Sequence, residues 1–150
     1  MLQSINSVSW RLPAIALLLA LSGLLSSCAR QDSLSEEQVG ALEDRVFERW
    51  ESLISRDFKQ AWSFGTPAFK EAFPQKLYPL KFSYSLDWEL TSIEVVNYDA
   101  RAGVASVVVR VMSKPTKQTS AASKALGAVP VNFREQWILI DGEWWYSANA

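Results

Sequence analysis

The spacing of apolar residues changes once along this chain, from a helical period in its first half to a period of two in its second. Apolar residues between positions 39 and 54 recur every three or four residues, which predicts one long amphipathic helix over about residues 36–55. From about residue 84 onward apolar and polar residues alternate, as in strands with one buried face. We therefore predict an α+β fold, with helices packed on an antiparallel sheet of about four strands. The helical stripe contains Val39, Leu42, Val46, Trp50 and Leu53, and Phe47 and Ile54 widen it.

Local signals predict where the helices begin and end. Ser35 and Gln38 form a capping box ahead of the long helix. A second helix is expected over residues 58–64, and Thr66-Pro67 supplies an N-cap and a first position for a third short helix. Residues 75–82 have no clear period, so we predict a packed connection there.

Turn residues divide the second half into four predicted strands. The first is expected to bulge or bend near Thr91 and Ser92, where its apolar residues change phase. Asp141-Gly142 is a two-residue hairpin signal. Residues 113–128 are rich in Ser, Thr, Ala and Lys without an apolar stripe, which predicts a long loop. The predicted strands cover residues 84–98, 104–112, 129–140 and 143–147.

The amino-terminal segment has the pattern of an export signal. A polar stretch ends at Arg11, the only charged residue before Cys28, and residues 13–25 form an uninterrupted apolar run. At 13 residues this run is shorter than the roughly 20 that a membrane-spanning helix needs. We therefore predict an export signal. The alternatives to a lipoprotein signal are an ordinary cleaved signal that happens to contain a cysteine and an uncleaved short anchor.

The residues Leu25-Ser26-Ser27-Cys28 resemble the lipobox of bacterial lipoproteins, and Cys28 is the only cysteine of the chain. The resemblance implies cleavage between Ser27 and Cys28 and acyl chains on Cys28, which together anchor a domain to a bilayer. Residues 1–27 would then be the signal peptide, 28–34 a lipidated tether and 35–150 one domain. The residue after the cysteine is Ala29, not Asp, which by the same resemblance favours the outer membrane, facing the periplasm.

Composition narrows the chemistry that this chain can perform. The net charge is −1 with no basic cluster, so nucleic acid is not an expected partner. Histidine is absent, which removes the commonest general base and the commonest metal ligand. We expect no metal and no cofactor.

The helices followed by strands, closed by the hairpin from Trp137 to Trp144, resemble the nuclear-transport-factor-2-like superfamily of cone-shaped α+β folds. This resemblance implies a strongly bent sheet and a cavity between the sheet and the long helix. Its members include isomerases, dehydratases, polyketide cyclases and pure binding modules, so the fold leaves the function open.

Glu135 is a candidate catalytic base. Its side chain points to the same face of the predicted strand as those of Phe133 and Trp137, so Glu135 would face the cavity if that face of the strand is the inner one. Tyr84 or Tyr98 would then be the nearby proton donor. The alternative, which we favour, places Glu135 on the exposed side of the sheet as an ion-pair partner. Its candidate partners there are Arg101, Arg110 and Arg134.

Tryptophans are the candidate ligand or interface residues. Trp50, Trp88 and Trp137 lie in apolar stripes and are expected in the core. Adjacent residues of a strand point to opposite faces, so either Trp144 or Trp145 is expected to face solvent or a partner. The candidates for a ligand site or an interface are Trp62, Trp144 and Trp145.

Two functions remain open. One is a non-enzymatic, membrane-tethered envelope lipoprotein that binds a small apolar ligand or an envelope protein, with a homodimer through the sheet face as a further option. The other is a small-molecule isomerase or dehydratase that uses Glu135 as base. The absence of histidine favours the first. The lysines of the predicted loop, Lys114, Lys117 and Lys124, are either a small anion-binding patch or a solvated surface.

Overall fold

The structure is a computed structural model and describes residues 33–117 and 119–148. The predicted signal peptide, including Ser27, and the lipidation site Cys28 lie outside the described residues. No helix within the described ranges is long and apolar enough to span a bilayer.

The long helix α2 covers Glu36–Ile54, as its apolar stripe predicts. Its capping box is formed: Gln38 N donates to Ser35 Oγ at 3.2 Å, and Ser35 N donates to Gln38 Oε1 at 2.9 Å. Two short helices follow, α3 (Phe58–Ser63) and α4 (Pro67–Ala72). The predicted connection after them is a 3₁₀-helix, η1 (Gln75–Lys81).

Four strands of the described chain form one open antiparallel sheet in the order β1-β2-β3-β4, so the predicted α+β class is confirmed. The register of β1 against β2 shifts between Leu90 and Ser92, which confirms the predicted bulge, and shifts again between Val95 and Asn97. Asp141 and Gly142 have φ of 52° and 83°, the conformation that a two-residue hairpin requires. The strands are β1 (Leu86–Asp99), β2 (Val104–Pro115), β3 (Val129–Ile140) and β4 (Glu143–Ser147).

Two expectations about local structure are wrong. Residues 113–128 are not one loop, because β2 continues to Pro115 and Ala121–Leu126 forms a short helix, α5. Phe47 does not widen the buried stripe of α2, because 49% of its surface is exposed. The stripe that the sheet covers is therefore narrower than the sequence pattern indicates.

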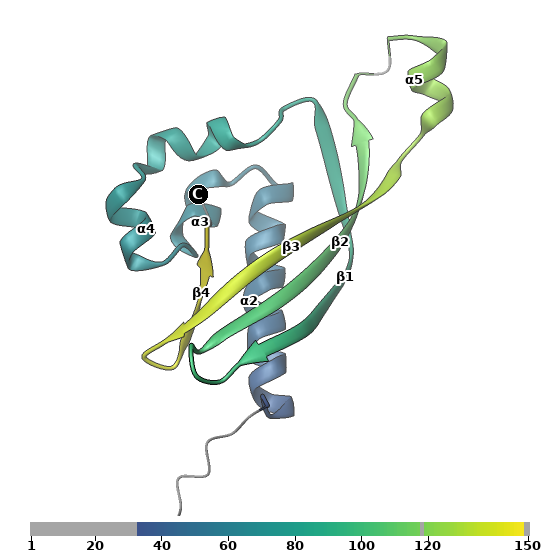
Figure 1. The fold of residues 1–150 in the computed structure, drawn as a ribbon. Coiled ribbons are helices and arrows are strands. Elements are labelled where there is room, and N and C mark those ends of the chain that lie inside the picture. Colours follow the sequence, from purple (N-terminus) through teal and green to yellow (C-terminus); the bar gives the residue numbers. More distant parts are fainter. Residues whose placement is uncertain (1–32, 118, 149–150) are drawn as a thin grey trace, which may run out of the picture. The chain divides into compact units, whose positions relative to one another are not determined.

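Helix α2 lies across one face of the sheet, and α3, α4 and η1 gather near the carboxyl end of α2 and beside β4, while α5 extends from the ends of β2 and β3 (Figure 1). The core fills the space between α2 and the inward side chains of the strands. Trp50 and Trp137 are buried in it as expected, and Trp88 is partly buried against it. Its most enclosed members include Leu42, Val46, Val107, Val109, Val111 and Trp137.

Candidate functional site

A buried ion pair links α2 to β3 in the middle of the core. Arg49 Nη1 lies 2.6 Å from Glu135 Oε1, and the two side chains are only 3% and 5% exposed. Arg49 is on the inward side of α2, next to Trp50, and Glu135 shares the inward phase of β3 with Trp137. The alternation of β3 therefore directs a carboxylate toward the helix, and Arg49 on the facing side of α2 balances its charge.

Glu135 is surrounded by N–H donors. Its Oε1 accepts from both Arg49 and the indole Nε1 of Trp50, the latter at 3.0 Å. Its Oε2 accepts from the indole Nε1 of Trp137, also at 3.0 Å. Three N–H groups from two elements therefore meet the two oxygens of this carboxylate and fix its position in the core.

Arg49 also contacts two tyrosines. Its Nη2 donates to Tyr78 Oη at 3.2 Å, and its guanidinium carbon lies 3.6 Å from the centre of the Tyr146 ring. Burial acts to lower the pKa of Arg49, but the adjacent Glu135 carboxylate, with smaller contributions from Tyr78 and Tyr146, holds that pKa above its ordinary value. Arg49 is therefore a permanent cation inside the core.

Burial raises the pKa of Tyr146 above its ordinary value, and the positive charge of Arg49 opposes part of that rise. The phenol of Tyr146 is thus held in its neutral form next to the guanidinium. In the described chain, Nε of Arg49 is the buried side-chain atom that has no hydrogen-bond partner.

A cavity of about 200 Å³ adjoins the ion pair. Five of its ten lining residues are aromatic, and the Trp50 ring lies 5.0 Å from that of Phe133 and 5.8 Å from that of Trp88. The cavity is smaller than the roughly 300–1,000 Å³ of most small-molecule sites, so it would suit a small group only. The other lining residues are Arg49, Leu53, Lys81, Phe82, Ser83, Glu135 and Tyr146.

The structure corrects the favoured expectation for Glu135. It does not lie on the exposed side of the sheet and does not pair with Arg101, Arg110 or Arg134; its partner is Arg49. Arg110 instead pairs with Glu94, at 3.0 Å.

The other catalytic candidate, Tyr84, is 59% exposed, packs edge-on against Phe58 and lies under the Arg56 guanidinium. It does not line the cavity beside Glu135, whereas Tyr146 does. Tyr98, the second proposed donor, packs against Trp144. The carboxylate and the two predicted tyrosines therefore do not form a common site.

The three candidate interface tryptophans have different surroundings. Trp144 is buried at 4% exposure, so it belongs to the core. Trp145, on the opposite side of β4, is half-buried beneath two cations, with Lys70 Nζ 4.2 Å and the Arg45 guanidinium carbon 5.7 Å from its ring centre. Trp62 is also half-buried, and its Nε1 donates to the carbonyl oxygen of Phe73 at 2.9 Å.

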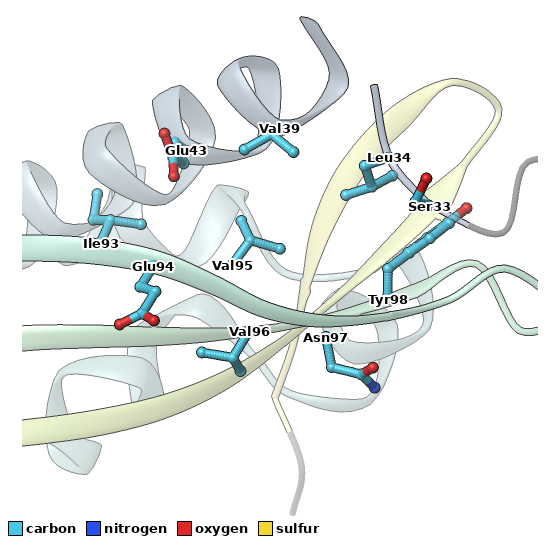
Figure 2. A pocket seen from close by; sticks show the side chains of 10 residues that line it. All are labelled: Ser33, Leu34, Val39, Glu43, Ile93, Glu94, Val95, Val96, Asn97 and Tyr98. Atoms are coloured by element: carbon cyan, nitrogen blue, oxygen red, sulfur yellow. The ribbon is translucent and has the colours of Figure 1, made fainter. Parts of the chain in front are cut away.

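A second, open groove of about 440 Å³ lies between the start of α2 and β1 (Figure 2). Leu34, Val39 and Val95 supply its apolar wall and Glu43 lies beside it, whereas the Glu94 side chain points to the other side of β1. The second bulge of β1 falls in this groove, at Val96. No group of three metal-ligating side chains gathers here or elsewhere in the described chain.

Sequence reasoning missed Arg49, although a signal for it was present. Leu42, Val46, Arg49 and Leu53 follow one another at intervals of four, three and four residues, which is the spacing of one helix face. An arginine on the buried face of a helix needs an anion within the core. Glu135 is the only acidic residue of β3, and it shares the strand phase of Phe133 and Trp137.

No protein-family model matches the chain, and no curated protein matches it. Among solved structures, the chain is similar to the solution structure of a SEC-C motif containing protein from Rhodopseudomonas palustris. The two are 13% identical with a TM-score of 0.38, and the match covers 66% of this chain and 69% of that chain. This likeness carries neither a family nor a function over to the present chain.

Proposed function

We propose that the chain is a lipid-anchored protein of the bacterial cell envelope, whose α+β domain binds a ligand or a protein partner and catalyses no reaction. The lipobox residues Leu25 to Cys28 support the anchor, and the order of helices and strands supports a cone-like domain similar to the nuclear-transport-factor-2-like superfamily. Its expected location is the outer membrane, facing the periplasm.

The observation that carries the non-enzymatic role is the hydrogen bonding of Glu135. A general base must have a free lone pair within reach of the substrate proton. Of the roughly four acceptor positions of a carboxylate, three on Glu135 are taken by Arg49, Trp50 and Trp137 inside the core, so only one, on Oε2, is left for a substrate. Use of this carboxylate as a base would also disturb its buried ion pair with Arg49, which joins α2 to β3.

The cavity beside Glu135 supports binding of a small group. Its aromatic wall suits an apolar body, and Lys81 and Ser83 are exposed polar residues among those that line it. A side chain of a partner protein or a small apolar ligand fits this description. A homodimer through the sheet face is a further proposal, because Val96 on that sheet is 46% exposed.

Mass spectrometry of the mature amino terminus tests the anchor. We expect the wild type to begin at Cys28 and to carry acyl chains, and Cys28→Ser to lack them. A wild-type chain that keeps residues 1–27 and has an unmodified Cys28 would contradict the proposal.

Co-purification after gentle solubilisation of membranes tests the binding role of the cavity. Ser83→Trp should block the cavity and abolish recovery of the bound molecule, whereas Gln60→Trp, at an exposed position of α3, should not. If both variants retain the same bound molecule as the wild type, the cavity is not the binding site. If the wild type always purifies alone, the binding role is wrong.

A further inference from the structure

Charge is distributed unevenly over the helical part of the domain. Residues 56–85, which include α3, α4 and η1, contain five basic and two acidic residues, a net charge of +3. Helix α2 contains six acidic and two basic residues, a net charge of −4. The region from α3 to η1 therefore carries a net positive charge, although the net charge of the whole chain is −1.

An exposed apolar ridge lies on the last element of this positive region. A 3₁₀-helix has three residues per turn, so Leu77 and Leu80 of η1 lie on the same side. Leu80 is 78% exposed and Leu77 is 39% exposed. Tyr78, on another side of the helix, is only 2% exposed and packs against the rings of Phe69 and Phe82, at 6.1 and 5.1 Å. Tyr78 thus anchors η1 while the two leucines, here called the leucine ridge, face outward.

Two exposed lysines flank the leucine ridge. Lys76 directly precedes Leu77, and Lys81 directly follows Leu80. By the same three-residue period Lys81 lies on the side of Tyr78 and not on that of the leucines, and its ammonium lies 5.1 Å from the centre of the Phe73 ring. Leucines that enter the boundary between headgroups and acyl chains, with lysines that meet the lipid phosphates, are the composition of an interfacial membrane contact.

We propose that the leucine ridge, with Lys76 and Lys81, docks on an anionic lipid bilayer. Charge complementarity argues for this partner: Arg56 is paired with Asp87, but the four lysines of the region still outnumber its two acidic residues, and each exposed lysine gains from negative headgroups. The contact does not require lipid on Cys28. The membrane contact can therefore exist even if the proposed lipid anchor does not. Where both are present, the contact fixes which side of the domain faces the membrane.

The test uses the full-length protein reconstituted into vesicles, with an environment-sensitive dye on a new cysteine at Leu80→Cys. Thr119→Cys, next to α5, is the control position. In vesicles containing phosphatidylglycerol we expect a blue shift of the dye at position 80 and none at position 119. In pure phosphatidylcholine the shift at position 80 should be lost or much smaller.

A pair of double variants distinguishes the two lysines beside the leucine ridge from lysines elsewhere in the domain. In the Leu80→Cys background, Lys76→Gln with Lys81→Gln should weaken the interaction with phosphatidylglycerol vesicles about tenfold or more, since each lysine contributes several-fold to binding. Lys114→Gln with Lys117→Gln, which removes the same charge near α5, should leave it unchanged. Equal loss in the two double variants, or equal dye signals at positions 80 and 119, would overturn the proposal.

Two further outcomes have fixed meanings. A blue shift that needs no lipid and grows with protein concentration would show that the ridge contacts protein, and would overturn a bilayer contact. The number of dyes per chain reports on Cys28, the only native cysteine: one dye indicates a blocked thiol and two indicate a free thiol. Failure of the lipid anchor is thereby distinguished from failure of the membrane contact.

Discussion

Arg49 and Glu135 lie 86 positions apart in the sequence, and inside the core Arg49 Nη1 is 2.6 Å from Glu135 Oε1. Their contact joins the carboxyl-terminal half of α2 to the middle of β3, the two elements between which the core forms. Because both charges are removed from water, each depends on the other, and a change to either should affect the whole domain.

Replacing Glu135 with Gln should destabilise the domain strongly. The substitution preserves shape but leaves the buried guanidinium of Arg49 without its counter-charge, a defect that typically costs about 3–5 kcal/mol. Urea denaturation followed by tryptophan fluorescence measures the loss. Glu94→Gln is the matched control, because it breaks the exposed pair with Arg110 and should cost less than about 1 kcal/mol. Similar losses in the two variants would contradict a buried pair.

Alkaline pH should destabilise the domain through Tyr146. The pKa of Tyr146 is raised by burial, so above about pH 10 the unfolded chain releases the phenol proton before the folded chain does. The free energy of unfolding therefore falls as the pH rises from about 10 through the folded pKa, and the contribution is fully present below pH 10. Tyr146→Phe should show a smaller fall in denaturation measured at several pH values. Tyr84→Phe, which alters an exposed ring, should follow the wild-type curve.

The elements that the sequence predicted well are those whose signals are local. The capping box at Ser35 sets the start of α2, and the regular alternation of residues 129–140 sets both ends of β3. Helix α5 was missed because its five small or polar residues and one leucine show no apolar period. The 3₁₀-helix η1 was missed because Pro79 interrupts any helical pattern.

The candidate site was predictable only in part, because its geometry depends on which faces meet. Alternation correctly grouped Glu135 with Phe133 and Trp137, but it could not say which face of β3 was buried. The position of α2 decides that question, and it brings Arg49 to the carboxylate. Tyr78 comes from η1, whose conformation had no signal in the sequence.

Two glycines should respond in opposite directions to replacement by alanine. Gly142 has φ of 83° in the β3–β4 turn, where a Cβ is strained although it meets no neighbour, so Gly142→Ala should cost about 1–2 kcal/mol. Gly40 lies inside α2 and also has nothing near its Cβ position, so Gly40→Ala should stabilise the domain by about 0.5–1 kcal/mol. Thermal denaturation of both variants checks the signs. A loss of stability in Gly40→Ala would contradict the described helix.

Replacing both members of the buried pair should be less harmful than the two single changes imply. Arg49→Met leaves Glu135 as an unpaired anion, and Glu135→Leu leaves Arg49 as an unpaired cation, so each single variant keeps one uncompensated buried charge. The double variant removes both charges and replaces them with apolar groups, which often restores stability in protein cores.

Recovery in this double variant should be incomplete for a specific reason. The indole N–H groups of Trp50 and Trp137 both donate to Glu135, and Leu at position 135 leaves them without an acceptor. Each unsatisfied buried N–H costs about 1–3 kcal/mol. A double-mutant cycle from denaturant unfolding should therefore give a coupling energy of about 2 kcal/mol or more, with the double variant still less stable than the wild type. Simple additivity of the two single losses would show that Arg49 and Glu135 are not paired in the folded protein.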